Sequence, residues 1–194
     1  MQRVVNLIGL ILLIAVSAGA QGPTGVGSNP PSFSSPDFPA WQISAGYQYN
    51  RINLTGTPFN TNGLNTSVVR YFGKWFGVEG QLGVGFGNTG ATSAPANLNV
   101  HSVFVGGGPK LAYRRWKGFE PWVHLVIGME NFRFSQTGGL LGNNTSVAGL
   151  GGGGIDYYLY PHVAVRAEMD AIESRFFSTN QRHFQVVSGL VFNF

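Results

Sequence analysis

Residues 163–170 read Val-Ala-Val-Arg-Ala-Glu-Met-Asp, and this stretch decides how the chain folds. Val165 and Met169 fall on odd positions, whereas Arg166 and Asp170 fall on even positions. Successive side chains of a strand point to opposite faces, so a period of two predicts a strand with one apolar and one charged face.

The same alternation recurs from residue 41 onward and predicts eight strands. They span approximately residues 41–50, 63–72, 77–87, 99–113, 119–133, 145–159, 162–173 and 182–194. The connections alternate between tight turns at 73–76, 114–118 and 160–162 and longer segments, rich in Asn, Thr, Gly and Ser, at 51–62, 88–98, 134–144 and 174–181. Short turns at one end and longer loops at the other are typical of an outer-membrane barrel.

The composition of the 194 residues excludes several other classes of protein. Charged residues make up 10% of the chain, against about 25% in ordinary soluble domains. The 15 Phe, 7 Tyr and 4 Trp exclude a disordered chain, and the lack of cysteine excludes a disulfide scaffold. The net charge of +4 is spread along the sequence, so no nucleic-acid partner is expected.

The first forty residues have a different character from the rest. Arg3, the apolar residues 7–16 and the small residues at 18–20 predict a signal peptide over residues 1–20, cleaved after Ala20. A membrane-spanning helix would need about 20 apolar residues, and this run is shorter. We predict that residues 21–40, rich in Pro, Gly and Ser, form a periplasmic leader and that residues 41–194 form the barrel.

The charged faces decide whether water or lipid surrounds this barrel. Outside a soluble barrel of the lipocalin type they would form only a sparse polar coat, whereas inside a membrane barrel they can pair while the apolar faces meet lipid. The ionisable residues on these faces are Arg70, Glu79, Lys110, Glu120, Glu130, Asp156, Arg166, Glu168 and Asp170.

Aromatic residues support the membrane interpretation, because they gather near both ends of the predicted strands, as at two membrane interfaces. Near the short turns are Trp41, Tyr71, Trp75, Phe76, Tyr113, Trp116, Trp122, Tyr157, Tyr160, Phe192 and Phe194. Near the longer loops are Tyr47, Tyr49, Phe86, Phe132, Phe134, Phe176 and Phe184. The sequence therefore predicts an all-β, eight-stranded antiparallel up-and-down transmembrane β-barrel with both termini in the periplasm.

The C-terminal residues also suggest how the barrel reaches its membrane. Gly189, Phe192 and Phe194 form a polar-Gly-x-x-aromatic-x-aromatic ending that is similar to the signal read by the bacterial outer-membrane barrel assembly machinery. The alternative is an ordinary lipid-facing strand that ends the chain. We expect a monomer in the outer membrane of a Gram-negative cell, with membrane lipid or lipopolysaccharide and the assembly machinery as partners and no cofactor.

Three pairs of charged residues flank the tight turns. If residue 72 pairs with 77, Arg70 lies opposite Glu79, and if 159 pairs with 163, Asp156 lies opposite Arg166. Lys110 and Glu120 lie roughly diagonally across the second turn. With Glu168 they are predicted to form one buried cluster, because burying this much charge is costly unless partners are satisfied.

Short motifs at these strand ends carry a resemblance. The segments Phe76–Glu79, Pro109–Tyr113, Gly153–Tyr157 and Val165–Glu168 resemble the strand ends of OmpA-type transmembrane barrels. The resemblance implies a salt-bridge gate made by Glu79, Lys110, Asp156 and Arg166, with the shorter Asp at one acidic position. We expect no peptidoglycan-binding domain, as in small stand-alone barrels of the OmpX type.

Several functions remain compatible with this pattern. The cluster either gates a small ion leak or simply fills the narrow lumen, and the inward glycines favour a void only mildly. A surface adhesin or receptor would act through residues 51–62 and 134–144. A lipid-modifying enzyme is the weaker alternative, because His124, inward near Glu120 and Glu130, has no Ser placed beside it. The histidines lie on four separate strands or turns, so we predict neither catalytic residues nor a metal site.

Overall fold

The computed structural model describes residues 39–54, 57–90, 97–114, 118–136, 139–176 and 179–194. The predicted signal peptide and nearly all of the predicted leader lie outside these residues. Within them, no helix is long and apolar enough to cross a membrane.

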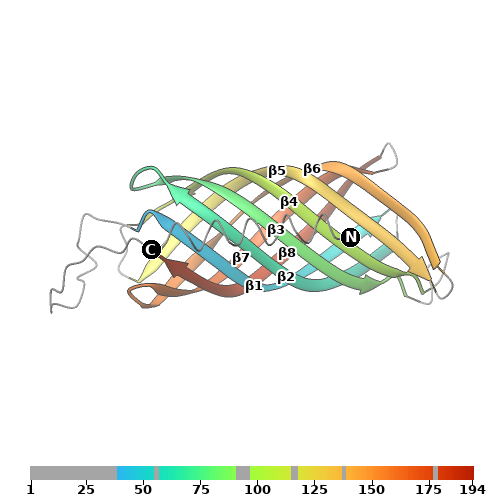
Figure 1. Cartoon of the computed structure of the whole chain (residues 1–194), viewed down its shortest axis with the longest axis horizontal. Coiled ribbons are helices and arrows are strands. Elements are labelled where there is room, and N and C mark those ends of the chain that lie inside the picture. Colours follow the sequence, from blue (N-terminus) through green and yellow to red (C-terminus); the bar gives the residue numbers. More distant parts are fainter. Residues whose placement is uncertain (1–38, 55–56, 91–96, 115–117, 137–138, 177–178) are drawn as a thin grey trace.

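The described residues form eight antiparallel strands: β1 (Trp41–Leu54), β2 (Thr57–Tyr71), β3 (Phe76–Asn88), β4 (Asn99–Ala112), β5 (Phe119–Gln136), β6 (Gly139–Tyr160), β7 (Val163–Phe176) and β8 (Thr179–Asn193). Each strand pairs with its neighbours in sequence, and β1 also pairs with β8, which closes the sheet into a barrel (Figure 1). The predicted eight-stranded up-and-down barrel is confirmed.

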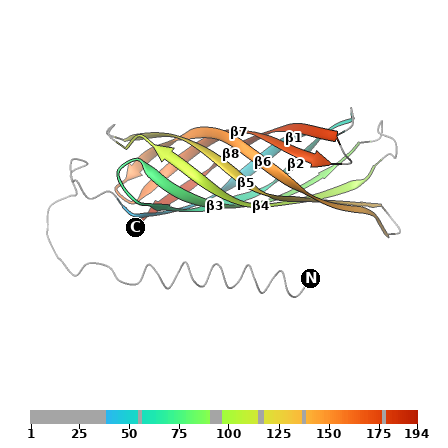
Figure 2. The same ribbon diagram turned by 90° about the horizontal axis from the view of Figure 1, so that it is seen from above.

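The two ends of the barrel differ, and we name them by their connections. At the turn end lie the turns after β2, β4 and β6 together with the C-terminus, where the Trp41 amide donates to the Phe194 carbonyl (3.1 Å) (Figure 2). At the tip end lie the connections after β1, β3, β5 and β7.

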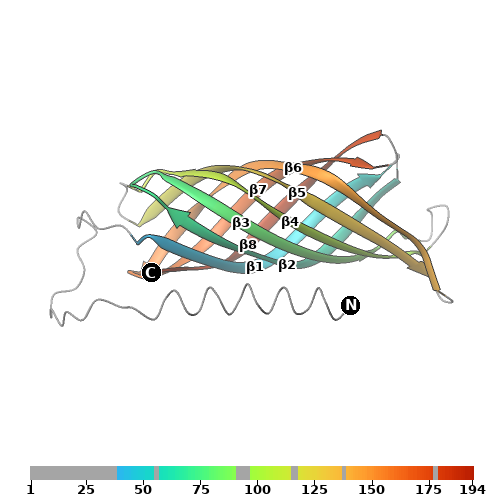
Figure 3. The same ribbon diagram turned by 45° about the horizontal axis from the view of Figure 1, so that its top comes forward.

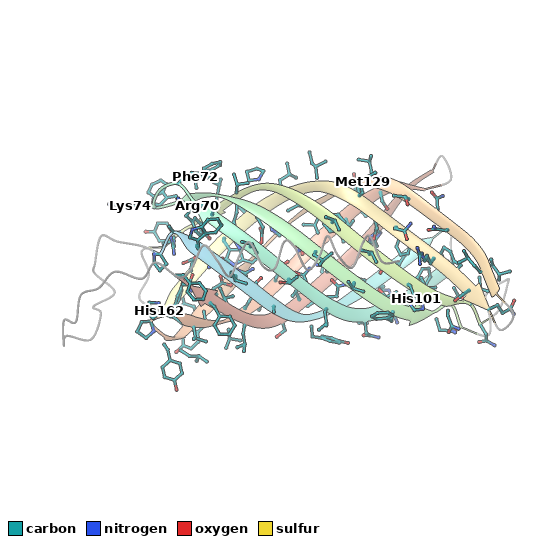
Figure 4. All side chains as sticks on the ribbon, in the orientation of Figure 1. Arg70, Phe72, Lys74, His101, Met129 and His162 are labelled. Atoms are coloured by element: carbon teal, nitrogen blue, oxygen red, sulfur yellow. The ribbon has the colours of Figure 1, made fainter. Side chains whose placement is uncertain are left out.

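The alternation in the sequence maps onto the two faces of the sheet. In β5 the side chains of Val123, Leu125, Ile127 and Met129 are exposed on the outer face, and Figure 4 shows Met129 pointing outward. Their even-numbered neighbours in β5 point inward, and the polar ones are buried in the lumen. An apolar outer face over a polar interior is the pattern of a barrel that meets lipid.

The strands extend further toward the tip end than the sequence predicted. Most of residues 51–62, 134–144 and 174–181 are strand, and residues 55–56, 137–138 and 177–178 lie outside the described residues. Residues 89–98 separate β3 from β4, close to the predicted longer segment at 88–98. The prediction was wrong because polar Asn- and Thr-rich segments resemble loops, although backbone pairing does not need apolar side chains. The β5–β6 hairpin extends furthest at the tip end (Figure 3).

Candidate functional site

In the lumen near the turn end, Arg166 and Asp156 form an ion pair that is joined by two hydrogen bonds. Arg166 on β7 lies directly opposite Asp156 on β6, as predicted. The Arg166 Nε and Nη2 atoms donate to the two Asp156 carboxylate oxygens, each at 2.8 Å. Arg166 Nη2 also donates to Gln42 Oε1 (2.9 Å), and the Trp122 indole donates to Asp156 (3.1 Å). Both charged side chains are almost fully buried, so their charges depend on these partners.

Lys110 and Glu79 extend this network across the lumen. The Lys110 ammonium lies 3.8 Å from Glu79 Oε1 and donates to Gln42 Oε1 at 3.3 Å. It also lies 3.7 Å from the centre of the Trp122 ring, which favours a cation. Arg166 Nη1 lies 3.7 Å from Glu168, so Glu168 joins the cluster as predicted.

Glu120 has a different partner from the predicted one. Lys110 lies opposite His124 rather than near Glu120. Glu120 instead accepts a hydrogen bond from Arg114 Nε at 3.0 Å and another from the Tyr158 hydroxyl at 2.7 Å. Arg114 was not predicted as a partner because it falls in a segment predicted to be a turn, whereas its side chain is buried at the turn end of the lumen.

Arg70 does not belong to the cluster, and its predicted pairing with Glu79 is wrong. Glu79 lies opposite Val69, whereas Arg70 lies opposite Val78. The turn is closed by a hydrogen bond from the Phe72 amide to the Phe76 carbonyl, so the pairing is shifted by one residue from the predicted register. Arg70 therefore lies on the outer face. Figure 4 shows Arg70 at the turn end, where its guanidinium stacks 4.7 Å from the Trp41 ring.

His124 lies between two lumenal carboxylates. Its Nδ1 atom lies 2.8 Å from Glu79 Oε2, and its Nε2 atom lies 2.9 Å from Asp170 Oδ1. Parity in the sequence placed His124 inward but beside Glu120 and Glu130, which was wrong, because partners across the lumen cannot be read from one strand. Glu130 instead lies 3.1 Å from His183 Nε2.

A second layer of the lumen, toward the tip end, contains two apolar clusters that were not predicted. One cluster comprises Phe104, Val126, Ala148, Leu150 and Ile172, and a second cluster, at the tip end, comprises Ile52, Phe59, Val100 and Phe132. Val126 and Phe132 share even positions with Glu120 and His124 on β5, and this parity could have revealed them. Ile52 and Phe59 were missed because they fall in a segment assigned to a loop.

Tyr71, Trp122 and Phe132 point inward, so they do not belong to the two predicted belts of aromatic residues at the ends of the strands. These three side chains are buried in the lumen rather than at the outer surface. Other members of both belts are exposed, including Trp75, Phe76, Tyr157 and Phe194 near the turn end and Tyr47, Phe86 and Phe184 near the tip end. Trp116 lies outside the described residues, and so does the side chain of Phe176.

The inward glycines allow close approach rather than a void. A Cβ atom at Gly46 would lie 2.8 Å from the Gly189 Cα, and one at Gly128 would lie 2.2 Å from the Val105 carbonyl oxygen. Glycine at these positions therefore lets neighbouring backbones meet around a narrow lumen. Gly189 of the C-terminal motif has this packing role, while Phe192 and Phe194 are exposed on the outer face.

Comparisons with known proteins agree with this architecture. No protein-family model and no curated protein sequence matches the chain. Among solved structures, Neisserial surface protein A matches with a TM-score of 0.68 and 11% identity, covering 80% of this chain and 97% of its own. The attachment invasion locus protein Ail of Yersinia pestis, solved with the heparin analogue sucrose octasulfate, has a TM-score of 0.55 and 19% identity, with 78% and 97% covered. The outer membrane protein OprG of Pseudomonas aeruginosa has a TM-score of 0.51 and 12% identity, with 83% and 99% covered.

These similarities define the class of the protein. The chain has the fold of the small eight-stranded barrels of bacterial outer membranes, which agrees with the resemblance found in its sequence. Its fold is therefore that of an outer-membrane β-barrel.

Proposed function

We propose that this protein is a structural and surface component of the outer membrane whose lumen is plugged, with at most a small gated ion leak. The observation that carries the proposal is the filling of the lumen by two different layers. Near the turn end, Arg166, Asp156, Lys110 and Glu79 occupy it as buried ion pairs. Toward the tip end, two apolar clusters that include Val126, Leu150 and Phe132 occupy it together with the buried Glu130–His183 pair.

The two layers oppose ion passage in different ways. Opening the ionic layer requires a buried pair such as Arg166–Asp156 to separate and find other partners. Opening the second layer requires hydrated ions to pass its two apolar clusters, whose side chains offer no hydrogen bonds, which resembles gating by dewetting. An ion leak therefore needs both layers to rearrange together.

Single-channel conductance in planar lipid bilayers tests this plug. The proteins to compare are the wild type, R166A, F132A and the double variant, each shown to be folded by its heat-dependent gel mobility. We expect brief, small openings at most in the wild type and clearly larger or longer openings in the double variant. A steady, large conductance of the wild-type protein would overturn the proposal.

The tip end favours a second candidate function, that of a surface adhesin or receptor. Within the described residues, β7 pairs with β6 only from Ala148 onward, so residues 139–147 of β6 have a strand neighbour on one side only. This edge carries neither charge nor proline, and Leu140, Leu141 and Val147 on it are exposed. Edges without such protection pair readily with another extended chain. We propose an extended, uncharged peptide segment of another protein as the partner.

Cell-surface binding assays separate this candidate from a purely structural role. In a variant with Leu140 and Leu141 changed to Lys, the edge gains charge while the lumen is untouched. An adhesin loses binding of the cells to their target in this variant but keeps its folded barrel. Unchanged binding excludes the β6 edge as the contact.

The route to the membrane and the lack of catalysis are part of the same proposal. We infer export through the signal peptide at residues 1–20 and recognition of Gly189, Phe192 and Phe194 by the assembly machinery, with lipid or lipopolysaccharide around a monomer. Catalysis is disfavoured because both ring nitrogens of His124 contact carboxylates rather than a nucleophile. Lipid turnover that disappears in H124A would contradict this inference.

A further inference from the structure

Three potential metal ligands converge in the lumen beside the ion pairs. His124 extends from β5, and Glu168 and Asp170 extend from β7, which is separated from β5 by β6 in the barrel. One ligand atom from each of these residues lies within 4.8 Å of the others. All three side chains are buried, so the group lies inside the lumen and away from the outer face.

Gly152 on the intervening strand makes this convergence possible. It lies opposite His124 on one side and opposite Asp170 on the other, in one row across β5, β6 and β7. A Cβ atom at Gly152 would lie 2.0 Å from Asp170 Oδ1. The missing side chain therefore opens the space in which the imidazole and the carboxylate meet.

Glu79 holds His124 in the orientation that a metal ligand needs. Its carboxylate lies 2.8 Å from Nδ1, so Nδ1 donates a hydrogen bond to it and Nε2 is directed at Asp170. Ligating histidines almost always donate their other N–H group to a carboxylate, carbonyl or water in this way. Glu79 is thus in the position of a positioning residue rather than a ligand.

Arg166 lies 3.7 Å from Glu168, but the described lumen around the group still holds more carboxylates than cations and contains buried oxygens without hydrogen-bond partners. The described lumen holds six carboxylates, those of Glu79, Glu120, Glu130, Asp156, Glu168 and Asp170, but only the three cations Lys110, Arg114 and Arg166. Gln81 Nε2 donates to Glu168 Oε1 at 3.4 Å, while the buried Gln81 Oε1 and Glu79 Oε1 atoms have no hydrogen-bond partner. A cation beside Glu168 and Asp170 offsets this excess, and buried charge is expensive without such an offset.

We propose that His124, Glu168 and Asp170 bind a divalent transition-metal ion in the lumen, with Glu79 orienting His124. One imidazole and two carboxylates form a borderline N/O ligand set that suits Zn²⁺, with bonds of about 2.0–2.2 Å. The 2.9 Å between His124 Nε2 and Asp170 Oδ1 opens by a few tenths of an ångström around such an ion, through rotation of the carboxylate. Gln81 Oε1 or water supplies the fourth position. Without a metal, His124 would instead be a cationic bridge between two carboxylates.

Zinc stoichiometry of the folded barrel tests the proposal. The protein, purified in detergent, is stripped with a chelator in urea, refolded with and without ZnCl₂, desalted, and analysed by mass spectrometry for zinc per folded barrel. We expect about one zinc for the wild type refolded with ZnCl₂ and a higher urea midpoint than for the metal-free protein. The isosteric variants D170N and E168Q lose the ion, whereas H101A, which removes an exposed histidine, keeps it.

The outcomes separate the metal site from the cationic bridge. Folded wild-type protein with less than about a tenth of a zinc, or equal zinc in wild type, D170N and E168Q, overturns the proposal. If one of the two variants does not fold, the other decides. Co²⁺ in place of Zn²⁺ gives an independent readout, because its visible spectrum reports N/O coordination and disappears when either ligand is changed.

Discussion

The Arg166–Asp156 pair makes the sharpest prediction about stability. In R166M the guanidinium is lost, while the Asp156 carboxylate stays buried with only the Trp122 indole and a distant Gln42 amide as donors. Removing one partner of a buried ion pair costs about 3–5 kcal/mol, because the other charge is left uncompensated. We therefore expect the free energy of unfolding of R166M to fall by this amount.

Arg182 provides the matched control. It pairs with Glu173 through the same types of group, but the two side chains are 77% and 61% exposed. An exposed pair contributes about 0–1 kcal/mol, so R182M should be nearly as stable as the wild type. The difference between the two arginine variants measures what burial adds to the same chemistry.

Equilibrium urea unfolding in detergent micelles or lipid vesicles measures both variants through tryptophan fluorescence. Trp122 is a local reporter, because its ring lies 4.6 Å from the Arg166 guanidinium. The double variant R166M/D156N should recover part of the loss, since it removes both charges rather than one. The reasoning is refuted if R166M and R182M lose similar amounts, or if the double variant is less stable than R166M.

Three further predictions test the register, the strand lengths and the close packing. The chain has no cysteine, so a thiol-reactive maleimide should label R70C rapidly and V69C slowly, because Arg70 is exposed and Val69 is fully buried. Equal labelling would contradict the observed register, in which Arg70 points outward. Amide hydrogen exchange should be slow over residues 59–62, which pair with β1, whereas a loop would exchange within seconds. G46V should prevent folding or cost several kcal/mol, because even the first carbon of its side chain would lie 2.5 Å from the Ser188 carbonyl oxygen; a stable G46V barrel, judged by gel mobility, would show that the Gly46–Gly189 contact is not required.

The face on which a side chain lies could be predicted from the alternation within one strand. The register between two strands also depends on the turn that joins them. The prediction that Asp156 lies opposite Arg166 is confirmed, although Val163 pairs with Tyr160 rather than with residue 159. An irregularity between Tyr158 and Tyr160 absorbs the difference before it reaches Asp156. No such irregularity compensates the turn after β2, so the one-residue error there moved Arg70 to the wrong face.

Partners across the lumen lie beyond what a single sequence can specify. His124 contacts Glu79 on β3 and Asp170 on β7, which are 45 and 46 residues away in opposite directions along the chain. The alternation along each strand predicts that all three side chains point inward. Their relative positions along the barrel axis, however, depend on the stagger of every strand between them. The candidate metal group could thus be recognised only after the barrel was closed.

The division of the lumen into an ionic and an apolar layer limits which functions the barrel can perform. Removing charge near Arg166 does not hydrate the layer of Leu150 and Phe132, and truncating Phe132 does not separate Arg166 from Asp156. Passage of ions therefore requires the buried ion pairs to separate and the apolar clusters to open at the same time. Binding at the tip end requires neither change. A metal held by His124, Glu168 and Asp170 would add a third fixed element to the plug. Under the proposed function the lumen stays closed, so the surface of the extended β5–β6 hairpin is where specific interactions should be tested first.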